Sequence, residues 1–448
     1  MIVTTETSEE TDAIVKEEID TIPRTKTLAR IYDISNKENP EFKREISIDG
    51  YYQDARMIEN NIYFITQCDL YLYKALNELQ DSEILPTYRD SSVSEERKII
   101  AATDIAYFEN SQSHSYSLVA GFNVNSNEQV NIETFFGAGQ NIYVSENNMY
   151  IVSRNYTNFW TTEDSTIYKF QLKNAKIVAI ADCKVDGYVN NQFSIDEYEG
   201  NLRVATTSMN ANFLEDEYEA KYVSHLTIFN EKLERIGSIE NLVEDEEIYS
   251  VRFMGKVGYI LTFRQIDPLW VIDLSDPTNP VIKGELEIPG YSSYLHPYDE
   301  THIIGIGYNV KDNGYGGVTR DTMKISMFDV SDLENPKEIF HISFGSKYMY
   351  SNIGYEHKAL FFKKSDNLIG FPVNWYDRVN KTGLILYRVD LENNRFEEIL
   401  DLVQKGYGYV QRALYIENHI YALYGDRILK YDLNTFEEIN RLDLSKDY

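Results

Sequence analysis

Basic and amide side chains recur at one position of a repeated segment of this sequence. When the repeats are aligned on their turns, Arg56, Arg252 and His296 share that position, and Gln192 and Arg412 fall close to it. Guanidinium, imidazole and amide groups hold carboxylates and phosphates, most strongly where the dielectric is low. The pattern predicts a low-dielectric site that attracts anions. The alternative is that these side chains pair with nearby carboxylates, namely Asp54, Asp196 and Asp299.

Tyrosine recurs at the entrance of the same repeated segments. The residues that we expect to form an aromatic collar are Tyr51, Tyr188, Tyr249, Tyr294, Tyr350 and Tyr409. Tyrosine rings present a flat apolar face and a polar edge, so such a collar could stack on sugars or on a partner's side chains. The alternative is that these rings wedge between neighbouring repeats as packing.

The sequence lacks the common motifs of catalysis and metal binding. It contains no P-loop, no G-x-S-x-G, no H-E-x-x-H and no EF-hand loop. Its seven histidines are scattered, and Cys68 and Cys183 are too few for a zinc site. We therefore expect no cofactor and no transition metal, while acidic loops leave weak Ca²⁺ binding open. The two cysteines are expected to be separate thiols, with a disulfide as the alternative.

A tight-turn motif repeats along the chain and sets the positions of these residues. Three strong copies are Tyr32–Pro40, Ile272–Pro280 and Phe328–Pro336. Weaker copies begin at Phe122, Phe170, Ile228, Tyr387 and Tyr431. Asp, Ser and Asn side chains cap tight turns, and Pro restarts an extended strand. Most neighbouring copies are about 44 to 60 residues apart, which is the spacing of four-stranded propeller blades.

Between these hairpins lies a second module of two strands and a short turn, as in Tyr51–Tyr63, Ile248–Tyr259 and Tyr409–Tyr421. One inner pair and one outer pair make a blade. We count seven complete inner modules and a remnant at Ile2–Thr5. The fold predicted is an all-β, single β-propeller domain over residues 1–448, with eight blades or, as the alternative, seven. The first blade is expected to lack its innermost strand. The inner modules would line a central channel.

Four stretches depart from the repeat and are expected to be loops or insertions. They are an acidic loop at 6–26 and insertions at 70–113, 208–221 and 308–321. Within the first insertion, Leu72–Leu79 is expected to form one or two helical turns. Insertions often cluster on one face of a propeller and carry its function.

The formal net charge of −29 argues against nucleic acid and anionic membrane surfaces as partners. The chain has no run of about 18 apolar residues, which a membrane-spanning helix requires. Its first residues also lack the basic and apolar regions of a signal peptide. The composition therefore favours a protein, peptide or glycan partner.

Three stretches, Asn190–Thr207, Tyr249–Gly255 and Thr262–Asp299, resemble a bacterial and archaeal family of secreted proteins with a C-terminal β-propeller domain. The resemblance covers the chain from about Arg24 onward. It implies a propeller located outside the cell or in the cell envelope, and it implies no reaction. Family members carry further N-terminal sequence, so an upstream segment of the full-length protein is expected to complete the first blade.

These observations favour a non-catalytic binding or scaffold module, with a ligand or partner site at one mouth of the central channel. The alternative is a hydrolase or lyase with its active site at that mouth.

Overall fold

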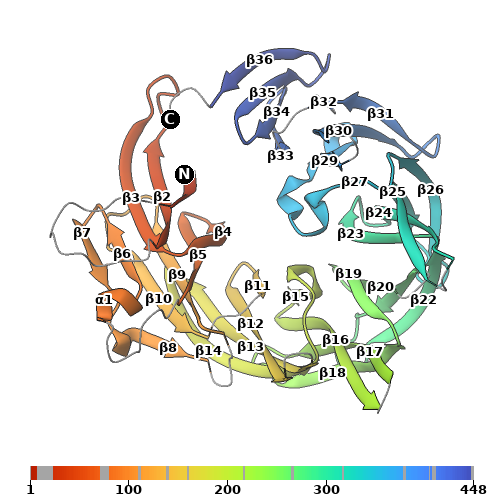
Figure 1. The fold of residues 1–448 in the computed structure, drawn as a ribbon, viewed down its shortest axis with the longest axis horizontal. Coiled ribbons are helices and arrows are strands. Elements are labelled where there is room, and N and C mark those ends of the chain that lie inside the picture. Colours follow the sequence, from red (N-terminus) through yellow and green to blue (C-terminus); the bar gives the residue numbers. More distant parts are fainter. Residues whose placement is uncertain are drawn as a thin grey trace. The chain divides into compact units, whose positions relative to one another are not determined.

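Short strands separated by tight turns make up most of the chain described by the computed structural model (Figure 1). The described residues are 2–7, 24–70, 80–108, 113–137, 141–158, 161–214, 217–263, 267–314, 317–376, 380–402, 404–405 and 410–444. Their strands form eight sheets, in which most neighbouring strands run antiparallel. The chain is thus an all-β propeller, and its sheets match the eight predicted blades.

The chain divides into two compact units. The first contains Met1–Leu202, Ser208–Tyr218 and Phe229–Glu234. The second contains Arg203–Thr207, Glu219–Ile228 and Arg235–Tyr448. The division runs through strands of the fourth sheet.

The first three sheets lie in the first unit. In spatial order, the first sheet consists of β1 (Ile2–Thr7), β2 (Thr25–Asp33), β3 (Glu41–Asp49), β6 (Thr87–Asp90) and β7 (Ser94–Ile99). The second consists of β4 (Tyr51–Ile58), β5 (Asn61–Asp69), β9 (Ser115–Asn123), β10 (Asn131–Phe136) and β8 (Ile105–Tyr107). The third consists of β11 (Asn141–Val144), β12 (Asn148–Asn158), β13 (Thr161–Lys173) and β14 (Lys176–Asp186).

The fourth sheet consists of β15 (Ile195–Tyr198), β16 (Asn201–Leu214), β17 (Glu217–Phe229) and β18 (Arg235–Glu244). The fifth consists of β19 (Glu247–Met254), β20 (Val257–Phe263), β21 (Asp267–Asp273) and β22 (Val281–Ile288). The sixth consists of β23 (Tyr291–Pro297), β24 (His302–Asp312), β25 (Val318–Asp329) and β26 (Lys337–Phe344).

The seventh sheet follows the order β27 (Met349–Tyr350), β29 (Leu368–Tyr376), β30 (Asn380–Asp390) and β31 (Arg395–Asp401). In addition, β28 (Phe361–Lys363) pairs with β29, and β32 (Gln404–Lys405) pairs with β30. The eighth consists of β33 (Val410–Ile416), β34 (His419–Tyr424), β35 (Arg427–Asp432) and β36 (Glu438–Asp443).

Apolar side chains from neighbouring sheets pack together, which is why the strands alternate in hydropathy. One buried cluster joins Leu261 and Val271 of the fifth sheet to Leu295, Ile303 and Phe328 of the sixth. Similar clusters join the first sheet to the second and the seventh to the eighth. In these three pairs, adjacent sheets therefore bury apolar side chains against each other.

The predicted turn chemistry is present in all three strong copies of the motif. The carboxylates of Asp33, Asp273 and Asp329 each accept a hydrogen bond from the backbone amide two residues later, at 2.9 Å. These bonds and those from the serine hydroxyls hold the pKa of each carboxyl below its usual value. The Asp-x-Ser spacing is thus a local cap that closes the outer hairpin.

Small residues on outer strands allow the next blade's turn to approach closely. A Cβ atom on Gly284 of β22 would lie 2.4 Å from the carbonyl oxygen of Leu333, in the motif turn of the sixth sheet. A Cβ atom on Gly237 of β18 would lie 2.2 Å from the carbonyl oxygen of Pro277, in the corresponding turn of the fifth. Glycine is required at both positions because another side chain would separate turn from strand.

The insertion predicted at 70–113 contains three short strands in its described part. Its short helix α1 (Asp81–Ile84) precedes β6 and β7, which extend the first sheet beyond β3, and β8 runs parallel to β10 in the second sheet. The helix predicted at Leu72–Leu79 lies outside the described residues. These added strands lack the alternating pattern of the repeat, so periodicity did not reveal them.

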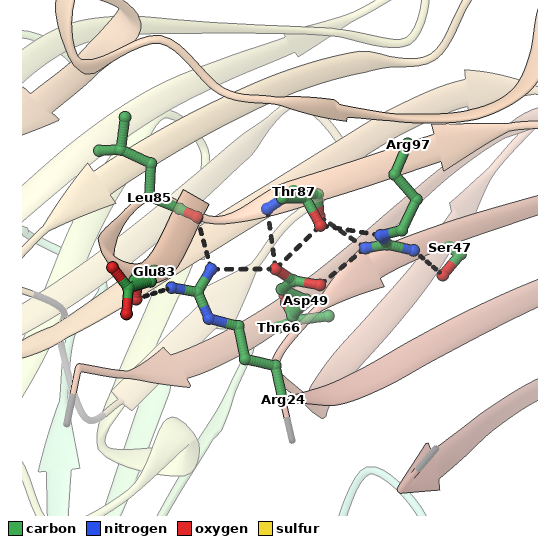
Figure 2. Close-up of polar contacts among 8 residues, drawn as sticks. All are labelled: Arg24, Ser47, Asp49, Thr66, Glu83, Leu85, Thr87 and Arg97. Atoms are coloured by element: carbon green, nitrogen blue, oxygen red, sulfur yellow. Dashed lines mark hydrogen bonds and ion pairs between the residues drawn. The ribbon is translucent and has the colours of Figure 1, made fainter. Parts of the chain in front are cut away.

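Buried charges attach this insertion to the first blade (Figure 2). Asp49, at the end of β3, is 1% exposed and pairs with Arg97 of β7 at 2.7 Å and with Arg24 at 3.4 Å. The amide and hydroxyl groups of Thr87 donate to the same carboxylate at 2.8 and 3.0 Å. Arg24 also donates to the carbonyl oxygens of Glu83 and Leu85 around α1. Asp49 therefore connects three segments of chain.

Two other predicted loops are extended hairpins. The acidic stretch at 208–221 belongs to the neighbouring strands β16 and β17, except for residues 215–216, which lie outside the described residues. In the stretch at 308–321, Val310, Lys311 and Asp312 pair with Arg320, Thr319 and Val318. Long strands at both places continue the ladders of the sheets beyond the usual blade length.

The predicted acidic loop at 6–26 is strand at both described ends, since Glu6 and Thr7 of β1 pair with Lys26 and Thr25 of β2. Residues 8–23 lie outside the described residues. Within the described residues, β1 forms one edge of the first sheet. No described helix is long and apolar enough to cross a membrane.

Candidate functional site

Two of the predicted anion-binding residues meet in the first unit. Arg56 of β4 donates to Gln192 Oε1 at 3.4 Å, although the two are 136 positions apart. Gln192 begins a short 3₁₀ helix just before β15. Arg56 also pairs with Asp54 at 2.8 Å. Two of the five aligned residues are thus in contact, and the alternative pairing of Arg56 with the carboxylate of Asp54 is present as well.

A second group lies on inner strands of the second unit, where Arg252 is on β19 and His296 on β23. Burial, and after it the positive charge of Arg252, lowers the pKa of the His296 imidazole to about 3. The ring is thus neutral at pH 7. Its Nδ1 lies 3.2 Å from the hydroxyl of Tyr294, and Phe362 of β28 packs edge-on against it at 4.4 Å. Tyr294 is buried, whereas the side chains of Arg252 and His296 are partly exposed.

Arg412, the fifth predicted residue, lies on β33 with an exposed side chain. None of its described contacts joins it to Arg252 or His296.

The predicted tyrosine collar divides into separate local contacts. Tyr51 donates to Asp69, and Arg154 lies over the ring of Tyr188 at 4.6 Å. Tyr294 is buried and stacks on His296 of the same strand, β23. Tyr409 lies outside the described residues.

Two further collar tyrosines make aromatic pairs in the second unit. Tyr249 contacts Tyr291 with ring centroids 5.3 Å apart, and Tyr350 stacks on Tyr376 at 5.1 Å. These pairs keep aromatic faces close to the ends of strands β19 and β27.

A cavity of about 350 Å³ lies in the second unit, where the turn after β23 meets two turns of the seventh sheet. Sequence reasoning missed it, because its residues come from three separate turns. The lining residues are Tyr298, Lys364, Asn367, Arg388, Val389, Asp390, Leu391 and Glu392. The sequence offered one signal for this cavity, namely the basic residues near strand ends at 363–364 and 388.

Tyr298 and Asn367 build a rigid part of this cavity. The Tyr298 hydroxyl donates to Asn367 Oδ1 at 2.7 Å, and the amide of Val389 donates to the Asn367 carbonyl at 2.8 Å. Asn367 has a left-handed backbone (φ 55°), which asparagine tolerates better than most residues. Burial and the charge of Asp299 raise the pKa of Tyr298 to about 12, so its hydroxyl stays protonated.

Two cations border the cavity, and both are partly exposed. Lys364 Nζ lies 3.1 Å from the centroid of the Tyr298 ring and 3.5 Å from Asp299. Arg388 is 3.8 Å from Glu397. The lining carboxylate of Asp390 accepts hydrogen bonds from Asn393 and Arg395, within its own turn. In the part of the chain that the structure describes, the ion pairs of Lys364 and Arg388 are therefore long. The carboxylate of Asp390, by contrast, already accepts hydrogen bonds from its own turn.

One histidine, His302, lies beside both a carboxylate and a hydroxyl. At the turn before β24, Asp299 Oδ1 and Thr301 Oγ1 lie 2.8 and 3.1 Å from Nδ1 of His302. Both contacts end on one nitrogen, so the ring cannot relay a proton from one group to the other. No group of three or more His, Cys, Asp or Glu in the described chain could hold a metal ion.

Both cysteines are free thiols, so the disulfide alternative was wrong. Burial raises the pKa of Cys68 to about 11 and that of Cys183 to about 12.

Comparison with known proteins places these observations in a family. Two archaeal relatives are uncharacterised proteins. The one from Archaeoglobus fulgidus is 36% identical over 286 residues, which cover 63% of this chain and 39% of the relative. The one from Methanocaldococcus jannaschii is 35% identical over 260 residues, which cover 58% of this chain and 38% of the relative. The chain thus spans well under half the length of these relatives.

Two solved structures match this chain at low sequence identity. BamB from Moraxella catarrhalis matches with a TM-score of 0.42 and 9% identity, over 77% of this chain and 89% of that one. The β-propeller domain of the Trilobed protease from Pyrococcus furiosus matches with a TM-score of 0.39 and 11% identity, over 88% and 95%. The beta propeller domain family matches residues 1–436. This chain, with its eight sheets and repeated hairpins, therefore belongs to the β-propeller domain family.

Proposed function

We propose that this protein is a non-catalytic binding module whose second unit holds a small anionic ligand beside Lys364 and Arg388. The observation that carries the proposal is the cavity of about 350 Å³ bordered by these two cations. Small-molecule sites typically occupy about 300–1,000 Å³ and combine an apolar or aromatic wall with a few polar groups. Tyr298 supplies the aromatic wall here.

Electrostatics favour a ligand that carries a carboxylate or phosphate. The nearest anionic partners of Lys364 and Arg388 are 3.5 and 3.8 Å away, which is long for charge-assisted hydrogen bonds. A bound anion could contact both cations at shorter range. The lining also contains the carboxylates of Asp390 and Glu392, so an anion would have to contact Lys364 and Arg388 directly.

The same residues argue for binding over hydrolysis or elimination. Lys364, Arg388 and Tyr298 donate hydrogen bonds, and Tyr298 is protonated because its pKa is about 12. A general base is most effective with a pKa near the working pH. The lining carboxyl of Asp390 has a pKa held below its usual value, chiefly by the hydrogen bond from Asn393. It is therefore a weak base at neutral pH.

Isothermal titration calorimetry tests this function with four probes: inorganic phosphate, citrate, glucose 6-phosphate and uncharged glucose. We expect at least one anion to bind and glucose not to bind. Lys364→Gln and Arg388→Gln should each weaken binding about tenfold, equivalent to about 1.4 kcal/mol. Lys283→Gln, on exposed β22, is the matched control and should change nothing.

Two results would overturn the proposal. One is an equal loss of anion affinity in Lys283→Gln, which would mean that anion binding depends on the overall charge of the chain. The other is absence of binding by all three anions at millimolar concentration.

We also propose that the protein works outside the cytoplasm, in the cell envelope or beyond it. The support is the resemblance of Asn190–Thr207 and Thr262–Asp299 to a secreted family. Immunodetection in separated cytosol, envelope and medium of the source organism tests the location. Detection in the cytosol alone would contradict it.

A further inference from the structure

Stacked and exposed tyrosines lie at the other end of β29 from the cavity. Tyr350 of β27 and Tyr376 of β29 have ring planes only 13° apart. Tyr376 is 38% exposed, and the neighbouring Tyr348 is 45% exposed. The backbone amide of Tyr376 donates a hydrogen bond to the backbone carbonyl of Tyr348. We call these three tyrosines the aromatic ledge. Because β29 is nine residues long, the ledge lies roughly 25–30 Å along the strand from Asn367 and the cavity.

An unsatisfied polar group shares the sheet face of the ledge. Tyr350 pairs directly with Asn374, and side chains of directly opposite residues lie on the same face. Tyr376, two residues further along β29, lies on that face too. Asn374 is only 5% exposed, and its Oδ1 has no hydrogen-bond partner. Asn352, two residues after Tyr350, also has a buried Oδ1 without a partner.

Such orphaned oxygens are costly, at about 1–3 kcal/mol each if nothing satisfies them. A native chain retains few of them, and each calls for a physical reason. Two such oxygens, on Asn374 and Asn352, are close in sequence to one pair of stacked tyrosine rings. They indicate a ligand that carries hydroxyl groups. Hydroxyls can donate to an amide oxygen, or accept from the amide nitrogen when the amide is turned over.

The ring type narrows the ligand class further. The exposed apolar residues of the ledge are tyrosines, which present flat faces and a polar edge, rather than aliphatic side chains. Sugar rings offer flat C–H faces for stacking together with hydroxyl groups around their rim. An apolar peptide side chain would cover the rings but leave Asn374 unsatisfied.

We propose that the aromatic ledge is a carbohydrate-binding site, in which a sugar ring stacks on Tyr376 and its hydroxyls reach Asn374 and Asn352 once binding has moved aside the chain that encloses their Oδ1 atoms. This site is separate from the anion cavity and does not depend on it. Its ligand is a neutral oligosaccharide or polysaccharide rather than a phosphorylated metabolite.

Affinity electrophoresis tests the proposal on the full chain. The protein runs through native gels containing laminarin, hydroxyethyl cellulose, glycol chitin or galactomannan, with bovine serum albumin as the unretarded reference. We expect retardation by at least one polymer. Tyr376→Ala should raise the apparent dissociation constant at least tenfold, whereas Tyr376→Phe should preserve it, because stacking needs the ring alone.

Matched variants separate this site from general effects. Tyr415→Ala removes another exposed tyrosine of the second unit and should leave retardation unchanged. Lys364→Gln, in the cavity, should also leave it unchanged, so failure of the anion proposal would not affect this one. Thermal midpoints of all variants, followed by circular dichroism, check that each protein is folded.

Three results would overturn the carbohydrate site. The first is no retardation by any of the four polymers, and the second is equal loss of retardation in Tyr415→Ala. The third is full retention of binding in folded Tyr376→Ala. Binding of a peptide library at the ledge, with no polysaccharide binding, would assign the ledge to a protein partner instead and would equally contradict the proposal.

Discussion

Asp49 Oδ1 lies 2.7 Å from Arg97 Nη2, and this ion pair joins the last residue of a repeat strand to a strand of the insertion (Figure 2). Breaking a buried pair by removing one partner typically costs about 3–5 kcal/mol, because the other charge loses its counterion. Arg97 is 23% exposed, so water would compensate in part. We expect Asp49→Asn to lower the free energy of unfolding by about 2–3 kcal/mol in urea titrations.

The control for this prediction is Asp426→Asn, which alters an exposed carboxylate beside Arg427. Surface pairs contribute about 0–1 kcal/mol, so this variant should be nearly as stable as the parent chain. Limited proteolysis of Asp49→Asn should also produce new cleavage within residues 80–99. Equal stability of the two variants would show that Asp49 does not hold the insertion.

Gly284 of β22 is predicted to be intolerant of a side chain. Its Cβ would meet the carbonyl oxygens of Leu333 and Glu334 at 2.4 and 3.0 Å, and backbone atoms cannot move aside as flexible side chains do. Overpacking of this kind costs about 1–3 kcal/mol, and we expect Gly284→Ala to lose stability in that range. Gly425→Ala is the control, since nothing lies within 4 Å of that added Cβ. Equal thermal midpoints for the two variants would contradict close packing of the turn on the strand.

The local part of this fold could be predicted from the sequence, because it depends on short-range chemistry. Asp329 and Ser331 form their turn within three residues, and the alternation of apolar residues marks the flanking strands. Two residues of the aligned set, Arg56 of the second sheet and Gln192 just before the fourth, also lie within hydrogen-bond distance of each other.

Features that depend on contacts between distant segments could not be predicted. Strand β6 has only four residues, Thr87–Asp90, and is held by Asp49 and by the pairing of Asp90 with Arg44 at 2.6 Å. The cavity likewise combines Tyr298, Lys364 and Arg388 from three turns. No periodicity relates such residues, because sheet packing alone brings them together.

His296 is predicted to make stability depend on pH in the mildly acidic range. Its pKa is about 3 in the folded chain and about 6.5 in an ordinary exposed histidine. Above pH 6.5 the imidazole is neutral in both states, so it adds no pH dependence. As the pH falls from 6.5 towards 3, the unfolded chain binds a proton at this position and the folded chain does not. The free energy of unfolding must therefore fall, by at most about 1.4 kcal/mol per pH unit.

His296→Gln removes this titration and keeps a neutral polar side chain near Arg252 and Tyr294. We expect the variant to be less stable than the parent chain at pH 7, and the difference to shrink as the pH is lowered. Urea unfolding at pH 7.0, 5.5 and 4.5 measures this difference in the free energy of unfolding. The many carboxylates contribute equally to both proteins, so they leave the difference unchanged. A stability curve for His296→Gln that runs parallel to that of the parent chain would mean that His296 binds a proton equally in the folded and unfolded chain, which would contradict the prediction.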